Sequence, residues 1–328
     1  FLLIIFDFAL DKIFSKNSFL VNNDELGWIL RPNQQVQKKL TSLKKNNYTV
    51  EFQTSNIEGF REYGDLSRKK KILVIGDSYT NGAYASRNDM YYSIANTILK
   101  KNDINLEWFI MGASGYGTVQ QYILLKKHFK VIKPDIILHQ FCNNDFYDNS
   151  YEISKIHTSH DQFYRRPFYK NNVFYKSNDI KSKIFRLMFE NSYIFRKIEQ
   201  MYSFKKYMKY GRFTEEIKPS YIKNSINITE EIFKNIRKLI GYDIKYFSTN
   251  CASISDSKLV DDFKLNEEWK RIIQSIDGYP LSEPSDYIIK MKDSELDLFN
   301  EDGGHLSILG NKIYGELIAN EILKVKLN

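Results

Sequence analysis

A serine follows a short buried-strand pattern in the sequence KILVIGDSYTNG, residues 71–82. The apolar run 72–75 is long enough for one buried strand and too short for a helix. In an open α/β sheet, ligands bind beyond the carboxyl ends of the strands. Ser78 therefore stands where such a sheet carries out chemistry, and its hydroxyl is the first candidate for a nucleophile.

A serine hydroxyl becomes a nucleophile when a base removes its proton, and the base works best when a third group orients it. His305 lies in the sequence Asp302-Gly303-Gly304-His305, directly before a predicted helix. Because the two glycines allow a tight backbone path, one loop can supply both side chains. We expect Asp302 to bind one ring nitrogen of His305 while the other nitrogen faces Ser78. A glycine-rich helix entrance with an exposed histidine is the alternative.

The other four histidines lie in less suitable places. His128 falls in a predicted helix and His139 in a predicted strand, where structural roles are expected. His157 and His160 form an H-x-x-H pattern followed by Asp161, but this irregular aromatic segment supplies no further ligand set for a metal. The sequence therefore predicts neither a metal nor a cofactor.

A tetrahedral intermediate needs hydrogen-bond donors that are fixed where its oxyanion forms. Gly115 lies in a small-residue loop after a second predicted strand, and Asn144 follows a third. The backbone N–H groups of Ser78 and Gly115 and the side-chain amide of Asn144 are the predicted donors. A simple turn glycine and a turn or capping residue are the structural alternatives for Gly115 and Asn144.

The elements that must position these residues alternate along the chain. Strands are predicted at 72–75, 104–111, 136–141, 243–249 and 286–291, and helices at 89–101, 118–132, 221–240, 267–276 and 306–325. This alternation predicts an α/β fold with one central five-stranded parallel sheet. The first three strands each end in a polar cluster, as a site built from strand ends requires.

Three further stretches lie outside this pattern. Residues 1–20 form an apolar segment, too short for a complete span, that indicates either the remnant of a membrane anchor or an amphipathic helix. Residues 21–70 form a β-rich extension, with strands predicted at 27–33 and 48–54. Residues 146–219 are a long aromatic insertion with one helix predicted at 180–210. We expect a lid or substrate-binding element there, with a structural elaboration or an oligomer contact as the alternative.

The composition narrows the class of protein. The chain has 328 residues, of which 42% are hydrophobic, enough for a large core. The net charge is +8, but the lysines are scattered and no nucleic-acid recognition motif accompanies them, so no nucleic-acid partner is expected. The loop after the first strand lacks the glycine patterns that hold phosphates, which argues against a nucleotide-binding protein. Cys142 and Cys251 belong to no C-x-x-C motif, and a disulfide between them is open.

Four blocks in this order resemble the SGNH (GDSL-type) hydrolases: Gly76-Asp77-Ser78, Gly115, Asn144-Asp145 and Asp302-x-x-His305. The resemblance extends from about residue 71 to residue 328, apart from the insertion. It implies a flavodoxin-like three-layer α/β/α sandwich. It also implies that Ser78 is the nucleophile, His305 the general base and Asp302 its orienting partner, with Ser78, Gly115 and Asn144 in the oxyanion hole.

Two positions depart from the pattern of that family. Tyr79 stands where Leu is usual, which should alter packing more than chemistry. Cys142 stands where Gly is usual, two residues before Asn144, and this side chain could narrow the site or shift the Asn144 loop.

The resemblance implies a serine ester hydrolase or O-acyltransferase that works through an acyl-serine. The extension, with LGW at 26–28 and GFR at 59–61, is similar to that of bacterial SGNH proteins of envelope polysaccharide metabolism. Acetyl esters of a cell-envelope carbohydrate are therefore the expected substrate and the cell envelope the expected location, with membrane association through the N-terminus. A lipid or thioester acylhydrolase with the same triad and a polysaccharide-binding protein without turnover are the alternatives.

Overall fold

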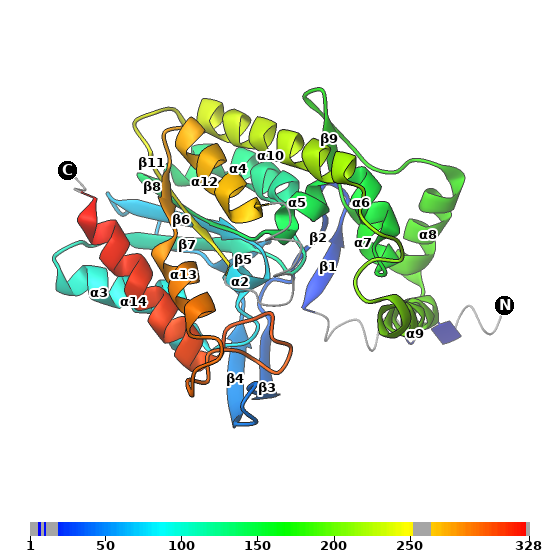
Figure 1. Cartoon of the computed structure of the whole chain (residues 1–328), viewed down its shortest axis with the longest axis horizontal. Helices are drawn as coiled ribbons and strands as arrows, with labels where there is room; N and C mark the ends of the chain where they lie inside the picture. Colours follow the sequence, from blue (N-terminus) through cyan, green and yellow to red (C-terminus); the bar gives the residue numbers. More distant parts are fainter. Residues whose placement is uncertain (1–5, 8–9, 11–18, 252–263, 326–328) are drawn as a thin grey trace.

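The structure, a computed structural model, describes residues 6–7, 10, 19–251 and 264–325. Its centre is a six-stranded sheet in the order β12-β11-β8-β6-β7-β5 (Figure 1). The parallel strands are β6 (Lys71–Gly76), β7 (Glu107–Gly112), β8 (Ile136–Phe141), β11 (Lys245–Asn250) and β12 (Tyr279–Leu281). The sheet thus has the five parallel strands expected from the sequence, although the last of them is formed by other residues than predicted. The sixth, β5 (Phe60–Glu62), runs antiparallel to β7.

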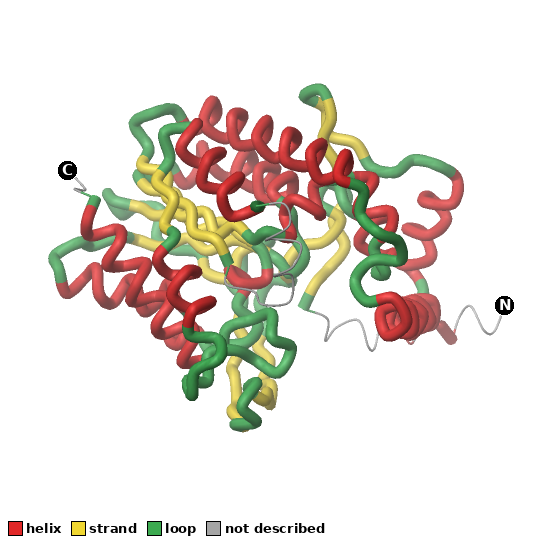
Figure 2. The backbone as a smooth tube through the Cα atoms, viewed as in Figure 1, coloured by secondary structure: helices red, strands yellow, loops and turns green. Residues whose placement is uncertain are grey.

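Helices cover both faces of this sheet, as Figure 2 shows. One layer holds α3 (Tyr91–Lys101), α13 (Glu283–Lys290) and α14 (Ile308–Lys324). The other holds α4 (Thr118–Ile132), α10 (Pro219–Ile240) and α12 (Leu265–Ser275). The predicted three-layer α/β/α sandwich is therefore confirmed.

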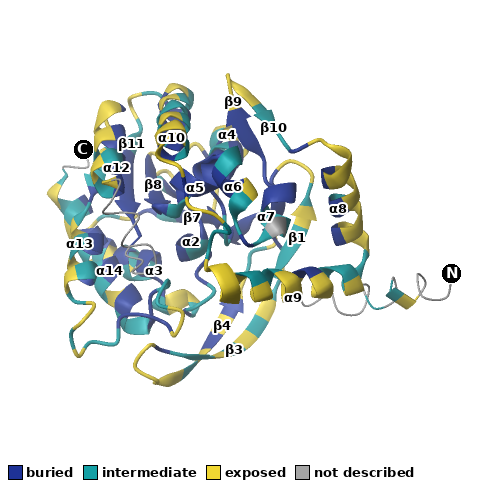
Figure 3. Ribbon diagram, turned by 45° about the vertical axis from the view of Figure 1, so that its right-hand side comes forward, coloured by how far each residue is buried: buried dark blue, intermediate teal, exposed yellow. Residues whose placement is uncertain are grey.

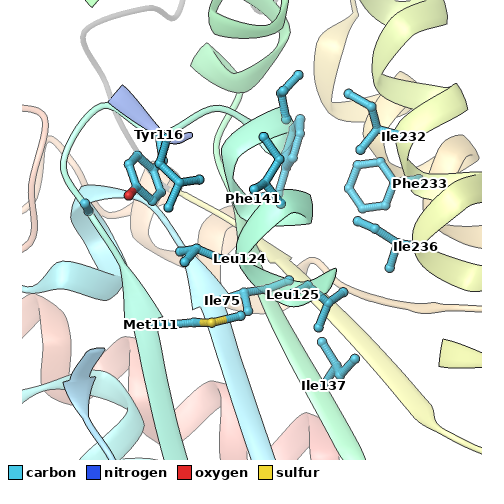
Figure 4. Packing of buried hydrophobic residues seen from close by; sticks show 14 of the residues in the cluster. Ile75, Met111, Tyr116, Leu124, Leu125, Ile137, Phe141, Ile232, Phe233 and Ile236 are labelled. Atoms are coloured by element: carbon cyan, nitrogen blue, oxygen red, sulfur yellow. The ribbon is translucent and has the colours of Figure 1, made fainter. Parts of the chain in front are cut away.

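Strand β6 shows why the sequence builds three layers. Successive side chains of a strand point to opposite faces. Ile72 and Val74 join the core beneath α3 and α14, whereas Leu73 and Ile75 join the core beneath α4 and α10. Figure 4 shows Ile75 among the side chains of this second core. Because both faces are covered, the strand is apolar throughout instead of alternating.

The last parallel strand lies earlier in the chain than predicted. Residues 286–291 were expected to form it, but most of them belong to helix α13. Pro284 in the first turn and the acidic residues Glu283 and Asp286 favour the start of a helix there. The strand is β12, whose three residues pair with β11 and are too few to give an apolar pattern.

The extension contains more strands than its sequence indicates. β1 (Leu20–Asn23) pairs with β2 (Gly27–Leu30), and β3 (Gln35–Thr41) pairs with β4 (Asn47–Gln53). Only β2 and β4 were predicted. β3 is largely polar, with no fully buried residue, and β5 has only three residues. Neither β3 nor β5 therefore carries a strong hydrophobic signal in the sequence. Strand β5 of the extension also belongs to the main sheet.

The insertion is also more regular than predicted. It contains α6 (Tyr151–Ile156), α7 (His160–Arg165), β9 (Phe168–Lys170), β10 (Val173–Tyr175), α8 (Ile180–Asn191) and α9 (Tyr193–Tyr210), after α5 (Asn144–Asn149). The single helix predicted for 180–210 is wrong, because Ser192 ends α8 and its hydroxyl caps α9 by accepting the Phe195 N–H at 2.9 Å. A small aromatic core of Phe163, Tyr164, Phe168, Phe185 and Phe189 holds these elements together.

Most of the apolar segment 1–20 lies outside the described residues, and so does the anchor expected there. Among the described residues, no helix combines the length and the apolar composition that a membrane crossing requires.

Candidate active site

Ser78, His305 and Asp302 form a continuous chain of hydrogen bonds. Nε2 of His305 lies 2.8 Å from Oγ of Ser78, and Nδ1 lies 2.6 Å from Oδ2 of Asp302. The other carboxylate oxygen of Asp302 accepts the backbone N–H groups of Gly304 at 2.9 Å and His305 at 3.0 Å. The structure thus brings together residues that are 227 positions apart, and both ring nitrogens of His305 are engaged.

The turn after β6 fixes the position of Ser78. Ser78 begins the short helix α2 (Ser78–Asn81), and the buried Asp77 caps it by accepting the Tyr79 N–H at 3.0 Å. A Cβ atom at Gly76 would lie 2.3 Å from Oγ1 of Thr80 and 2.8 Å from a backbone carbonyl of β8. A glycine is therefore required where the chain leaves the sheet.

The triad loop, residues 297–306, is bound to the β3–β4 hairpin of the extension. The backbone N–H of Leu43 donates to the carbonyl of Phe299 at 2.8 Å, and that of Glu301 donates to the carbonyl of Thr41 at 3.0 Å. These bonds hold the loop to a part of the chain other than the helix that follows it, α14. The extension therefore helps to position Asp302 and His305, a role that its sequence did not indicate.

Aromatic rings enclose the imidazole of His305. The ring of Tyr84 stacks on it, with centroids 4.2 Å apart and planes at 15°, and Tyr79 packs against it at 5.8 Å. The Tyr84 hydroxyl also bonds to the Asp302 carboxylate, and burial together with this negative charge raises the pKa of Tyr84. Tyr84 is a part of the site that the sequence did not single out.

The Asp302 carboxyl is held in its charged form. Burial alone would raise its pKa, but the hydrogen bond and charge of His305 and two backbone N–H groups lower the pKa below its ordinary value. An ionised Asp302 can hold the Nδ1 proton of His305 and stabilise the imidazolium when it forms.

The predicted oxyanion donors Ser78, Gly115 and Asn144 line one cavity of about 190 Å³ together with His305. Gly115 has φ +77°, a conformation that favours glycine, and its carbonyl accepts a hydrogen bond from Nη2 of Arg166 at 2.7 Å. The Nδ2 group of Asn144 donates to Oδ2 of Asp148 at 3.0 Å. One of the two N–H bonds of Asn144 is therefore already used.

A buried ion pair connects these two donors. Arg166, 1% exposed, lies 2.7 Å from the Asp148 carboxylate, 9% exposed. Because Arg166 binds the carbonyl of Gly115 and Asp148 binds the amide of Asn144, one pair orients both. Arg166 comes from the end of α7, so the insertion is part of the structure around the site. No motif in the sequence marked it.

The insertion also supplies one wall of the cavity, through His157, Gln162 and Arg212. Burial and the nearby Arg212 lower the pKa of His157 to about 4, so its imidazole is neutral. Nδ1 of His157 accepts the Ser159 N–H at 2.9 Å. Within the described residues, no three or more His, Cys, Asp or Glu side chains come together as metal ligands.

The two cysteines form a disulfide that also lines the cavity. Strands β8 and β11 are paired in register, with Phe141 opposite Asn250, so the next residues of each strand lie side by side. The Cα atoms of Cys142 and Cys251 are 4.9 Å apart. The residue that replaces the expected glycine therefore joins two strand ends at the site and leaves no free thiol there.

Asp77, Asp145 and Asp148 form a buried carboxyl cluster behind Ser78. Burial, together with the charges of its two neighbours, raises the pKa of Asp145 well above its ordinary value. Its Oδ2 atom accepts hydrogen bonds from Thr118 and Gln121, each at 3.0 Å. These effects favour the protonated form of the Asp145 carboxyl, and that form places less negative charge near the nucleophile.

His139 and His128 have structural surroundings. His139 is fully buried, and its ring nitrogens bind Tyr246 and Gln121. Burial lowers its pKa to about 3. The His128 ring packs edge-on against Phe60 at 4.8 Å. Both agree with the structural roles predicted for them.

No protein-family model matches the chain, and no curated protein matches it in sequence. Solved structures with a similar fold include a family 3 carbohydrate esterase from Clostridium thermocellum, with 12% identity over 78% of this chain and 98% of that chain and a TM-score of 0.43. A lipase/acylhydrolase from Enterococcus faecalis has 14% identity over 77% of this chain and 95% of that chain, with a TM-score of 0.45. A member of the lipolytic G-D-S-L family from Veillonella parvula has 10% identity over 78% of this chain and 100% of that chain, with a TM-score of 0.47. At these identities the similarity is one of fold alone.

Proposed function

We propose that this protein is a serine ester hydrolase of SGNH type that removes acetyl groups from a carbohydrate of the cell envelope. The observation that carries the proposal is the hydrogen-bonded chain from Ser78 through His305 to Asp302. A hydroxyl beside a base that is itself oriented by a carboxylate is the arrangement that activates serine for attack on an ester.

The reaction follows from these contacts. Oγ of Ser78 attacks the ester carbonyl while Nε2 of His305 takes its proton, and Asp302 stabilises the resulting imidazolium. The backbone N–H groups of Ser78 and Gly115 and the amide of Asn144 serve as donors to the oxyanion. His305 then protonates the leaving alcohol. Water, activated by the same histidine, hydrolyses the acyl-serine and restores Ser78.

The space around Ser78 supports a short acyl group. The cavity with Gly115 and Asn144 holds about 190 Å³, below the roughly 300–1,000 Å³ of sites for drug-sized ligands. A second cavity, beside Tyr79, Tyr84 and Met90, holds about 10 Å³, roughly the room of one water. Neither of these two cavities gives a long acyl chain an apolar channel, which disfavours a lipid substrate.

The wall that the insertion supplies supports a polar alcohol component. His157, Gln162 and Arg212 offer hydrogen-bonding groups to the cavity, and sugar hydroxyls can satisfy such groups. The aromatic residues of the insertion are not what favours a sugar, because Phe163, Tyr164 and their neighbours pack in its own core. The disulfide supports a location in the envelope, since disulfides persist in oxidising compartments.

The test is hydrolysis of p-nitrophenyl acetate, p-nitrophenyl dodecanoate and acetylated xylo-oligosaccharides by the wild type and by Ser78→Ala. We expect acetate release from the short ester and the sugar, and a loss of about 10⁴-fold or more in Ser78→Ala. Labelling by a fluorophosphonate should disappear in the same variant. Faster cleavage of the dodecanoate would contradict the acetyl assignment.

The same assays distinguish hydrolysis from acyl transfer and from binding without turnover. Activity retained in Ser78→Ala would refute the mechanism. Absence of labelling with sugar binding intact would indicate a binding protein. Acetate that appears on an added sugar instead of in solution would identify an O-acyltransferase, because both reactions share one acyl-serine and differ in the acceptor.

A further inference from the structure

Much of the ribbon of the helical hairpin formed by α8 and α9 has the colour of exposed residues (Figure 3). Many of these exposed residues are apolar. On α9 the exposed fractions are 59% for Ile198, 63% for Met201, 64% for Phe204 and 69% for Met208. On α8 they are 77% for Ile180, 52% for Ile184 and 64% for Leu187. Because residues three and four apart are neighbours on a helix, each set forms one stripe. We call the two sets together the apolar stripes.

These stripes do not hold the insertion together. Helix α8 already buries Phe185 and Phe189 in the aromatic core. Helix α9 turns Glu199, only 9% exposed, toward the protein, where its Oε1 accepts the Ser203 hydroxyl at 2.9 Å. A surface helix of a soluble protein normally buries its apolar side and exposes its charges. Helix α9 has Glu199 as its buried residue and exposes its apolar stripe together with Lys197, Lys205 and Lys209. Its apolar stripe is therefore available for another surface.

Positive charge surrounds the apolar stripes. Residues 180–210 contain eight Lys or Arg and two Glu, a net charge of +6, and the whole chain has a net charge of +8. One of the two acids is the buried Glu199. Thirty-one residues (180–210) therefore carry most of the net charge that looked scattered in the sequence.

We propose that the α8–α9 hairpin lies on an anionic lipid surface, with the apolar stripes at the level of the upper acyl chains and the lysines among the headgroups. Helices that combine an apolar face with many lysines bind in this way. A second copy is a poor partner, because it would bring another +6 to the same surface. The proposal concerns a surface away from the triad and does not depend on ester hydrolysis.

The start of the chain supports this orientation. Phe6 is 57% exposed, and the Asp7 carboxylate accepts the backbone N–H of Ile194 at 2.9 Å. This bond places part of the apolar N-terminal segment at the first turn of α9. The exposed Phe6, next to Asp7 in the chain, therefore lies near the first turn of the helix that carries one of the apolar stripes.

The test is co-sedimentation of the full chain with vesicles of phosphatidylcholine alone or mixed with phosphatidylglycerol. We expect binding to the anionic vesicles that weakens as salt is added. The double variant Met201→Glu/Phe204→Glu should reduce binding by about tenfold or more, because it places charges in the acyl layer. Val131→Glu is the matched control, since Val131 is 56% exposed on α4. It should bind as the wild type does.

A charge variant separates the two contributions. Lys205→Gln/Lys209→Gln keeps the apolar stripes and should lose the preference for anionic vesicles. Circular dichroism and p-nitrophenyl acetate hydrolysis confirm that each variant is folded. The proposal fails if the wild type binds neither vesicle, or if Met201→Glu/Phe204→Glu binds as the wild type does, since residues 1–18 would then be responsible. It also fails if ultracentrifugation shows a dimer that this variant abolishes without any vesicle binding.

Discussion

Two hairpins have been added to the sandwich, and they differ in where their side chains find partners. The β3–β4 hairpin finds them inside the chain. Its Asn46 amide donates to the Asp297 carboxylate at 2.6 Å, and its Tyr48 hydroxyl binds Asn300. The α8–α9 hairpin packs through one side and leaves the apolar stripes in contact with solvent.

The difference indicates a division of tasks. The β3–β4 hairpin makes specific hydrogen bonds to the triad loop, and such bonds fix a geometry that the chemistry needs. The exposed side of the α8–α9 hairpin does not position any catalytic residue. Its apolar area and its positive charge suit a partner other than this chain. We therefore expect variants of the first hairpin to change turnover and variants of the second to change binding to vesicles.

A substitution in the triad should separate turnover from vesicle binding most strongly. Asp302→Asn should lower kcat by about 10³–10⁴-fold, because a neutral amide no longer holds the right tautomer or stabilises the imidazolium. Vesicle binding should be unchanged. Stopped assays with p-nitrophenyl acetate and co-sedimentation of the same sample measure both. A variant that lost both properties together would show that the two regions are not independent.

Substitutions in the buried part of the insertion should lower the stability of the protein much more than substitutions on its exposed side. Arg166→Met removes one partner of the buried pair with Asp148 and leaves a buried charge uncompensated. We expect a loss of about 3–5 kcal/mol in the free energy of unfolding by urea. Lys209→Met is the control on α9, where the side chain is exposed, and it should leave the free energy of unfolding unchanged within the error of the measurement. If Arg166→Met and Lys209→Met changed the free energy of unfolding equally, the buried and exposed parts of the insertion would not differ as proposed.

The buried Asp145 gives a pH test that involves neither hairpin. Its pKa is raised, so the folded state keeps a proton that the unfolded state releases above about pH 4. Stability should therefore fall as pH rises from about 4 toward the raised pKa. Asp145→Asn cannot ionise and should remove this fall.

At pH 8 we expect Asp145→Asn to be more stable than the wild type by about 1.4 kcal/mol for each pKa unit that the fold imposes. Near pH 4 the advantage should vanish. In the variant Asp145→Asn the new amide oxygen can still accept the hydrogen bonds from Thr118 and Gln121. Urea unfolding at both pH values measures the difference, and an advantage independent of pH would refute the explanation.

The smallest effect is expected at the β3–β4 hairpin. Tyr48→Phe removes the hydrogen bond to Asn300 and should cost about 1 kcal/mol of stability and a few-fold in kcat. The matched control is Lys45→Ala, which removes an exposed ion pair with Glu301 at 2.7 Å. That pair should contribute about 0–1 kcal/mol and leave kcat unchanged. If Lys45→Ala lowered kcat as much as Tyr48→Phe does, the result would contradict a specific role for the Tyr48 hydrogen bond.

Much of the fold could be predicted from local patterns. The helix at 118–132 and the strand at 136–141 have the bounds expected for them. The helix carries apolar residues at helical spacing, and the strand begins with a short apolar run of the kind that a strand covered on both faces requires. Helix α13 and strand β12 could not be predicted so well, because three residues give no period and the short apolar stretch of 286–291 fits a strand as well as a helix.

The sequence by itself determined which residues carry the candidate chemistry. Each of Ser78, Gly115, Asn144 and His305 follows a strand or precedes a helix, and these are local features. It did not determine the distances between them, nor the roles of Tyr84 and Arg166. Those depend on contacts between segments far apart in the chain, for which one sequence gives no local signal.

The tertiary structure alone decided the disulfide, the support of the triad loop and the outward side of α9. Cys142 meets Cys251 because β8 and β11 pair in one register, and register is set by the whole sheet. The apolar period of α9 predicts a helix with an apolar side, but not whether that side meets the core or the solvent. The packing of α8 and α9 on the insertion's own core made that choice.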